Sequence, residues 1–190
     1  MLTEKFSAAV SLAAQAHANQ IRKGAGTPYI AHPLGVAALV IEFGGDEDQA
    51  IAALLHDVLE DGGPQFAAPI EQQFGARVLG LVEACTDGMP DASGKKAPWK
   101  ERKLAYLQHL ADSPDDALLI SASDKLHNAR AILDDLRDPG VGLGVFDRFR
   151  ASKEETLWYY GELARIFSER QCPVARKLSD TVAEIRRMAA

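Results

Sequence analysis

The segment 52–61 joins an apolar run to a group of side chains that can do chemistry. Its polar members are His56, Asp57, Glu60 and Asp61. On a helix, residues three and four apart share a face, so these groups would crowd one side. Carboxylates held together repel one another and are costly to bury, and a divalent cation would relieve that cost. The alternative is an amphipathic helix whose acidic side faces water.

Two further candidate ligands lie elsewhere in the chain. His32 precedes Pro33, and Asp124 lies far downstream in a helical pattern. Taken alone, His32 is typical of a histidine in a turn, and Asp124 of a polar residue on a helix face. Together with His56 and Asp57 they form a mixed nitrogen and oxygen donor set, which suits manganese, iron, cobalt or zinc better than calcium or magnesium. These four side chains are therefore candidate ligands of one metal site.

The two acids that follow the His-Asp pair could act on water. Glu60 or Asp61 could orient an attacking water molecule and take its proton, provided that one of them lies within hydrogen-bond reach. The sequence does not favour one over the other, so both remain candidate catalytic residues.

Three residues are candidates for binding the substrate. Arg22 and Lys23 fall in the loop before His32, so they could reach the same cleft and neutralise an anionic substrate. The alternative for both is a solvated basic pair. Asn128 lies four residues after Asp124 on the same helix face, so its amide could touch a ligand beside the metal. Its alternative is a surface amide.

Four neighbouring side chains are assigned other roles. We interpret Lys125 and Arg130 as surface charges first. Tyr29 could stack on a base or pack in the interior, and packing is favoured. His127 is not expected to be a metal ligand.

The composition is that of an ordinary globular chain with an acidic balance. The 190 residues carry a net charge of −6, which argues against general nucleic-acid binding. Cys85 and Cys172 form no Cys-x-x-Cys pair, so we expect neither a disulfide framework nor a thiolate zinc site. The N-terminal segment does not resemble a signal peptide, and no apolar run approaches the roughly 20 residues that cross a bilayer. We expect a cytoplasmic protein with no membrane or nucleic-acid partner.

Helical patterns dominate the elements that must position these groups. We predict one all-α domain of roughly eight to ten helices, with no strand pair and no repeat. A capping box at Asp46 and Gln49 opens the helix that carries the His-Asp pair. The last helix has an apolar face that could form a homo-oligomer interface or close the core, and core closure is favoured. The predicted helical segments are 3–20, 34–43, 46–62, 69–74, 76–86, 99–111, 113–136, 146–169 and 173–188.

Three segments resemble the hydrolase domain of the RelA/SpoT family, which belongs to the HD-domain metal phosphohydrolases. They are Arg22-Lys23 with Thr27-Pro-Tyr-Ile-Ala-His-Pro33, Ala53-Leu-Leu-His-Asp-Val-Leu-Glu-Asp61, and Asp124-Lys-Leu-His-Asn128. The resemblance covers about residues 5–165, with the three segments in the order and spacing of the family. Within it, the chain is similar to the stand-alone small alarmone hydrolases of the Mesh1 type.

The resemblance implies a single HD-type metal-dependent phosphohydrolase domain over residues 1–190. It implies that one metal, usually manganese in this family although another divalent transition metal would serve, is bound by His32, His56, Asp57 and Asp124. It assigns the catalytic acidic pair to Glu60 and Asp61, and contacts with the nucleotide substrate to Arg22, Lys23 and Asn128. The implied reaction removes the 3′-pyrophosphate from ppGpp or pppGpp and gives GDP or GTP and pyrophosphate.

The substrate stays open because the chain departs from the family pattern beside the ligands. The loop after Lys23 reads Gly-Ala-Gly in place of a Ser-Gly pair, Gly62 stands where Thr is common, and Ser121-Ala-Ser123 lacks a lysine before Asp124. One alternative keeps the chemistry and changes the substrate to adenosine alarmones, NADPH or another nucleotide. Another alternative is a nucleotide-binding sensor that has lost catalysis, against which the intact acidic pair argues.

Overall fold

The computed structural model describes residues 1–22, 24, 26–86 and 97–190. Within these ranges the chain forms nine α-helices and no strand, which confirms the all-α prediction. A single antiparallel bridge joins Ile21 and Pro28. The helices are α1 (Glu4–Ala16), α2 (Ala31–Glu42), α3 (Glu47–Leu55), α4 (Ala67–Phe74), α5 (Ala76–Cys85), α6 (Trp99–Asp112), α7 (Asp115–Arg137), α8 (Lys153–Glu169) and α9 (Ala175–Ala189).

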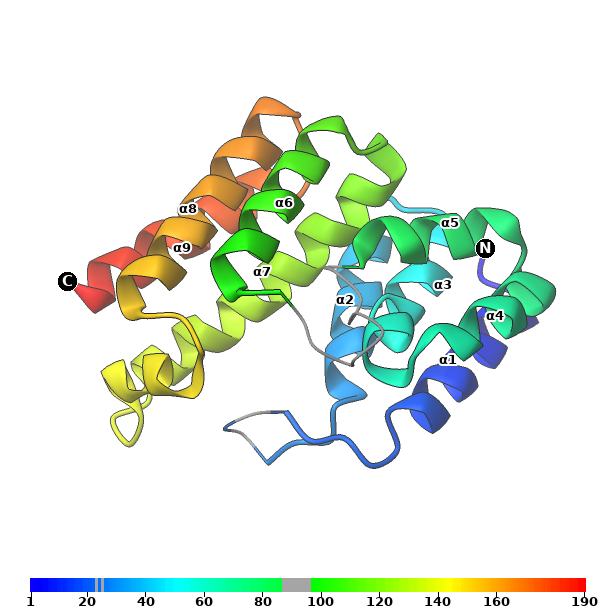
Figure 1. Cartoon of the computed structure of the whole chain (residues 1–190), viewed down its shortest axis with the longest axis horizontal. Coiled ribbons are helices and arrows are strands. Elements are labelled where there is room, and N and C mark those ends of the chain that lie inside the picture. The colour runs from blue at the N-terminus through cyan, green and yellow to red at the C-terminus, as the bar shows by residue number, and fades with distance from the viewer. Residues whose placement is uncertain (23, 25, 87–96) are drawn as a thin grey trace.

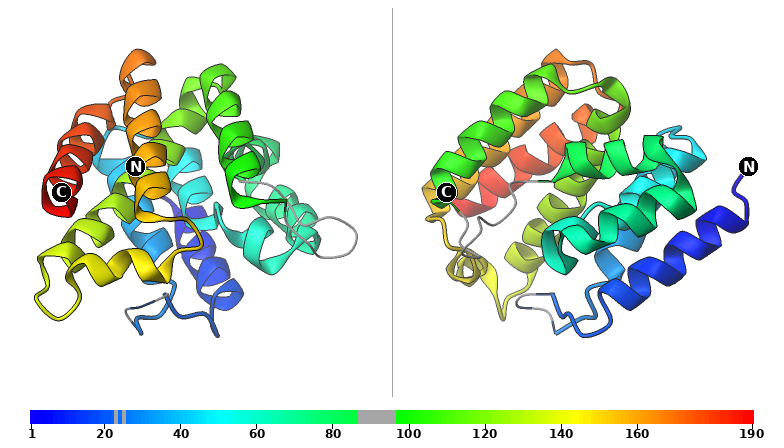
Figure 2. Two further views of the ribbon diagram at one scale, coloured as in Figure 1. Left: turned by 60° about the vertical axis from the view of Figure 1, so that its left-hand side comes forward. Right: turned by 45° about the vertical axis from the view of Figure 1, so that its right-hand side comes forward.

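The long helix α7 runs through the middle of the molecule and contacts both ends of it. On one side it packs against α2, α3 and α5, and α1 packs in turn against α3. On the other side it packs against α8 and α9, with α6 on α8. The two termini lie at opposite ends of the long axis (Figure 1). The right-hand view in Figure 2 shows α6, α8 and α9 gathered at one end of the molecule and α1, α4 and α5 toward the other.

Helix α3 lies in the hydrophobic core. Every side chain from Ala50 to Leu55 is fully buried, so the two residues that follow, His56 and Asp57, are presented from the middle of the protein. The predicted capping box is confirmed: Asp46 accepts from the Gln49 backbone and the Gln49 side chain accepts from the Asp46 backbone. Burial of apolar surface stabilises the folded chain by about 25 cal/mol for each Å². The buried helix therefore holds His56 and Asp57, which follow it, in a fixed position.

The predicted helix over 46–62 was wrong at its C-terminal end. The α-helix ends at Leu55, and Val58–Gly62 forms a π-helical turn. The ring of His56 donates from Nδ1 to the Ala53 carbonyl at 2.8 Å, and this contact competes with the backbone bond that would continue the α-helix. Single π turns are frequent at functional sites, where they re-aim side chains.

The predicted helix over 146–169 was also wrong at its N-terminal end, whereas its C-terminal end at Glu169 is confirmed. Gly142–Arg148 forms a 3₁₀ turn, and α8 begins only at Lys153. Ser152 forms a capping box with Glu155, in which the Ser152 hydroxyl accepts from the Glu155 backbone at 3.1 Å. This S-x-x-E cap starts a new helix and leaves the preceding chain to turn.

The C-terminal helix closes the core, as favoured from its pattern. Leu178, Val182 and Ile185 are buried within one chain, where α9 packs on α7 and α8. Cys85 and Cys172 are both free and buried, in agreement with the expected lack of a disulfide. In the described residues, no helix combines the length and the apolar character that membrane spanning requires.

Candidate functional site

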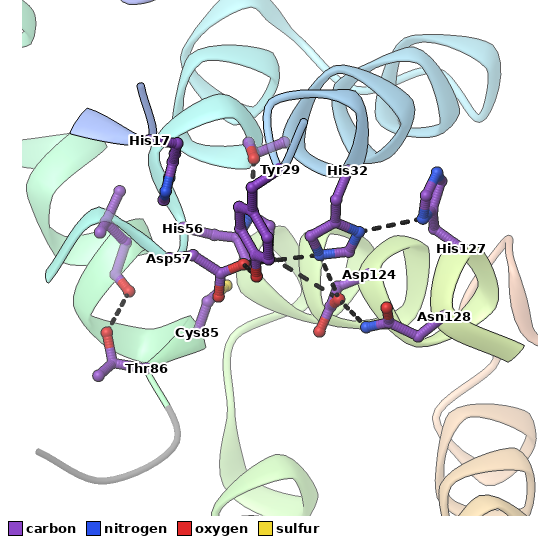
Figure 3. Close-up of polar contacts among 12 residues, drawn as sticks. His17, Tyr29, His32, His56, Asp57, Cys85, Thr86, Asp124, His127 and Asn128 are labelled. Atoms are coloured by element: carbon purple, nitrogen blue, oxygen red, sulfur yellow. Dashed lines mark hydrogen bonds and ion pairs between the residues drawn. The ribbon is translucent and has the colours of Figure 1, made fainter. Parts of the chain in front are cut away.

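Three of the four predicted metal ligands converge on one point in the interior. His32, His56 and Asp124 each offer a donor atom, and these atoms all lie within 4.8 Å of one another. They come from the first turn of α2, the end of α3 and the middle of α7 (Figure 3). His32 therefore lies on a helix and not in a turn. Nε2 of His32 is 3.1 Å from Oδ1 of Asp124.

The fourth predicted ligand, Asp57, adjoins both imidazoles. Its Oδ2 atom is 3.1 Å from Nε2 of His56 and 3.5 Å from Nε2 of His32. The same oxygen accepts a 2.6 Å hydrogen bond from the Tyr29 hydroxyl. Tyr29 packs beside His17, with ring centroids 4.9 Å apart. The packing predicted for Tyr29 is thus confirmed, but its hydrogen bond to a candidate ligand was not foreseen.

The hydrogen bonds of the two imidazoles leave their Nε2 atoms facing the centre. Nδ1 of His56 lies 2.8 Å from the Ala53 carbonyl, which can only accept, so Nδ1 carries a proton and donates it. Nδ1 of His32 lies 3.0 Å from Nδ1 of His127, outside the centre. Histidines that bind a metal almost always donate their other ring N–H to such a partner, which fixes the ring and its tautomer.

Strong electrostatic coupling holds the cluster together. Burial alone would lower the pKa of His56, but Asp57 and Asp124 outweigh it and raise that pKa to about 9. Burial alone would raise the pKa of Asp57, but the His56 imidazole outweighs burial and lowers that pKa. Asp124 is likewise buried, but Lys125 and the histidines hold its pKa well below the usual range. The cluster therefore keeps two carboxylates ionised and attracts positive charge.

The residues present fit a divalent transition metal. Nε2 of His56 is buried and makes no hydrogen bond of good geometry with any described residue, although Asp57 Oδ2 is near. A buried imidazole nitrogen without a partner is costly, and a metal ion would satisfy it. Two imidazoles with two carboxylates are a donor set for manganese, iron, cobalt or zinc.

The carboxylate of Asp124 is held by two residues of its own helix. Asn128 donates from Nδ2 to Oδ1 at 2.6 Å, and Lys125 donates from Nζ to Oδ2 at 2.6 Å. The interpretation of Lys125 as a surface charge was wrong, because its side chain is only 12% exposed. Burial would lower the pKa of Lys125, but Asp124 outweighs it and raises that pKa well above the usual value.

His127 lies behind His32 and is not among the converging donors, as predicted. Burial, His32 and Arg22 lower the pKa of His127 to about 4, so the ring is neutral near pH 7 and its Nδ1 can accept. The close approach of α2 and α7 at Gly35 brings the two rings together: a Cβ at Gly35 would lie 2.3 Å from Nε2 of His127. Arg22 donates to Asn128 Oδ1 at 3.0 Å and approaches His127.

Two more of the predicted site residues follow Asp57 directly in the chain. Glu60 is half-buried and Asp61 exposed on the π turn directly after Asp57. Asp61 lies near enough to Tyr29 to contribute, after burial and Asp57, to raising the Tyr29 pKa. Lys23 lies outside the described residues.

We call His32, His56, Asp57 and Asp124 the metal-type cluster. A cavity of about 370 Å³ adjoins this cluster on the α7 side. Lys125 and Asn128, which hold Asp124, also line this cavity. In the described residues that line it, four carry a positive charge and one a negative charge, although the whole chain has a net charge of −6. The charged lining residues are Arg22, Lys103, Lys125, Arg148 and Asp135. Aromatic rings from Trp99, Phe149, Tyr159 and Tyr160 also line the cavity.

The residues that sequence reasoning undervalued are those whose roles depend on distant segments. Tyr29 and His127 touch candidate ligands from distant segments, and only the fold brings these partners together. For Lys125 a local signal existed, since it directly follows Asp124. The Trp and Tyr residues of the cavity carried no such signal.

Comparison with known proteins identifies the family. A model of the HD domain matches residues 9–149. Over 125 residues the chain is 42% identical to guanosine-3′,5′-bis(diphosphate) 3′-pyrophosphohydrolase MESH1 of Xenopus tropicalis, covering 64% of this chain and 66% of that protein. Over 163 residues it is 34% identical to the bifunctional (p)ppGpp synthase/hydrolase SpoT of Escherichia coli strain K12, covering 85% of this chain and 21% of that protein.

A solved structure has a similar fold over the entire chain. It is that of a metazoan ortholog of SpoT that hydrolyzes ppGpp, with a TM-score of 0.78 and 27% identity, and the match covers 100% of this chain and 99% of that one. The curated metazoan relative is matched over slightly less than two thirds of its length. From the family model and the converging His and Asp side chains, we conclude that this chain belongs to the HD domain family.

Proposed function

We propose that this protein is a metal-dependent 3′-pyrophosphohydrolase that acts on guanosine alarmones. The observation that carries the proposal is the contact between a His/Asp metal-type cluster and a cationic cavity, made through Lys125 and Asn128. The similarity to MESH1 and to the SpoT ortholog that hydrolyzes ppGpp supports this substrate class.

The cluster would hold the metal and the cavity the nucleotide. His32, His56, Asp57 and Asp124 are the proposed ligands, and manganese is the proposed ion, with another divalent transition metal as the alternative. When bound, such an ion lowers the pKa of a coordinated water and polarises a phosphoryl oxygen. Arg22 and the other cavity cations would neutralise the phosphates, and the aromatic wall offers surfaces on which a base can stack.

In the proposed reaction, water hydrolyses the bond between phosphorus and the ribose O3′. The oxygen of water bonds to the phosphorus attached to the ribose O3′, the P–O3′ bond breaks with its electron pair on O3′, and O3′ ends protonated. Glu60 or Asp61, on the turn after Asp57, takes the proton of the attacking water. The products are GDP or GTP and pyrophosphate, and we propose that the reaction takes place in the cytoplasm.

The direct test measures pyrophosphate release with Mn²⁺ from a panel of ppGpp, ppApp and NADPH. Release from ppGpp supports the proposal, and release only from ppApp would transfer the same chemistry to adenosine alarmones. Phosphate release from NADPH alone would make the protein a nucleotide phosphatase. Tight ppGpp binding without turnover would make it a sensor. Asp57→Ala should lose both bound metal and turnover, whereas Asp180→Ala, on the exposed part of α9, should lose neither.

A further inference from the structure

Lys125 is a largely buried cation placed between a candidate metal ligand and the nucleotide cavity. Its Nζ atom lies 2.6 Å from Oδ2 of Asp124 and 4.8 Å from the centre of the Tyr106 ring. Its side chain also lines the cavity. Burying an ammonium group is costly unless its charge is compensated, so a lysine in this position has to be explained.

The two oxygens of Asp124 face different partners. Oδ1 points to His32 and receives the Asn128 amide, whereas Oδ2 is taken by Lys125. A cation held at Oδ1 would therefore share the single negative charge of Asp124 with Lys125. Occupation of the metal site leaves the lysine charge less compensated, and that charge borders the cavity where an anion would lie.

The ammonium group also has hydrogen-bonding capacity that the protein does not use. It carries three N–H donors. Asp124 is its one hydrogen-bond acceptor within the described part of the chain, and the face of Tyr106 provides a cation–π contact without an acceptor oxygen. A donor can therefore turn toward the cavity while Asp124 keeps the side chain in place.

We propose that Lys125 is a catalytic residue that binds a non-bridging oxygen of the substrate's 3′-pyrophosphate. This inference rests on the proposed function and assigns a role to a side chain beyond the predicted site. As water adds to phosphorus and the P–O3′ bond breaks, Lys125 compensates negative charge on the transferred group. A fixed donor of this kind acts most strongly in a water-poor site, and removing one such donor lowers kcat by about 10²–10³-fold.

The alternative is that Lys125 only positions Asp124, and the two roles predict opposite effects on the metal. If Lys125 mainly held the ligand, its loss would weaken metal binding. If it competes with the metal for the charge of Asp124 and serves the phosphate, its loss leaves metal binding unchanged or tighter while phosphate binding weakens. Lys125→Met removes the charge and keeps most of the chain length, and Lys125→Arg keeps the charge.

The experiment measures Mn²⁺ affinity by calorimetry, inhibition by inorganic pyrophosphate, and kcat with ppGpp. We expect Lys125→Met to bind Mn²⁺ at least as tightly as the wild type, to lose at least about 10²-fold in kcat, and to be inhibited less by pyrophosphate. Lys125→Arg should recover part of both losses. Lys177→Met, on the exposed face of α9, is the matched control and should behave as the wild type.

Two results would overturn the inference. One is a parallel loss of Mn²⁺ affinity and kcat in Lys125→Met, and the other is wild-type kcat and pyrophosphate inhibition in that variant. If the wild type releases no pyrophosphate from any nucleotide, the proposed function fails. Direct binding of pyrophosphate to the Mn²⁺-loaded wild type and Lys125→Met proteins would then still test whether Lys125 binds this group.

Discussion

The hydroxyl of Tyr29 donates a 2.6 Å hydrogen bond to Oδ2 of Asp57, so a residue before α2 holds a candidate ligand that follows α3. We expect Tyr29→Phe to weaken Mn²⁺ binding by about 10–100-fold, because partners that orient a ligand contribute this much to metal affinity. The ring stays beside His17, so the melting temperature of the metal-free protein should stay near that of the wild type. Calorimetric titration and thermal melts measure the two effects. Unchanged Mn²⁺ affinity would show that the hydrogen bond does not support the ligand.

The close packing of α2 on α7 predicts that alanine substitutions at two glycines have opposite effects on stability. A methyl group at Gly35 would lie 2.3 Å from the His127 ring, whereas one at Gly80, on the exposed face of α5, meets nothing within 4 Å. Overpacking in Gly35→Ala should destabilise the fold by about 1–3 kcal/mol and displace His127 from His32. Gly80→Ala should stabilise it by about 0.5–1 kcal/mol, because glycine is unfavourable within helices.

Thermal denaturation distinguishes these two variants, since each kcal/mol shifts Tm by about 2–4 °C in a protein of this size. The double variant Gly35→Ala with His127→Ala should recover stability, because it removes the ring that the new methyl group would contact. A stable Gly35→Ala protein with wild-type Mn²⁺ affinity would contradict the packing account.

The acidic pair on the π turn should matter for turnover and not for metal retention. Glu60 and Asp61 follow Asp57 but are not among the converging donor atoms. We expect Glu60→Ala to keep bound metal while kcat falls by about 10²–10⁴-fold, the range for loss of a general base. Metal analysis of the purified variant and steady-state kinetics test this, with Glu71→Ala on the exposed side of α4 as the control. A near-normal rate in Glu60→Ala would remove this residue from the catalytic assignment and leave Asp61.

The buried thiol of Cys85 should resist alkylation in the native protein. Burial raises its pKa from the ordinary value of 9.0 to about 12, so at pH 8 it carries its proton and the reactive thiolate is scarce. The folded chain holds this proton to higher pH than the unfolded chain does, so its contribution to stability is present below pH 9 and is lost as the pH rises toward 12. Timed labelling with iodoacetamide at pH 8, with and without denaturant, provides the measurement. Rapid modification of Cys85 in the folded protein would contradict its burial.

Much of the site could be predicted from the sequence because its ligands belong to local patterns. His56 and Asp57 end an apolar helix, and Asp124 and Asn128 are spaced one turn apart, so the types and spacing alone indicate a shared face. That His32 joins them depends on the packing of α2 against α7, which no local pattern contains. The family resemblance supplied that link.

The two wrong helix boundaries lie where side chains hydrogen-bond to the backbone and interrupt a regular helix. The π turn after Asp57 forms where His56 takes the Ala53 carbonyl, a contact that a periodicity argument does not include. The break before α8 was readable, because Ser152 and Glu155 form an S-x-x-E cap within what hydrophobic spacing alone predicts as a continuous helix. Lys125 was taken for a surface charge because single-residue preference ignores the aromatic ring and carboxylate that surround it.

We propose that His32, His56, Asp57 and Asp124 together hold one divalent cation. Anomalous diffraction from crystals grown with Mn²⁺, recorded at the manganese edge, locates that ion directly. We expect one strong peak within bonding distance of both Nε2 atoms and of an oxygen from each carboxylate. A fully occupied peak elsewhere, or none at this cluster under Mn²⁺ concentrations that support turnover, would contradict it.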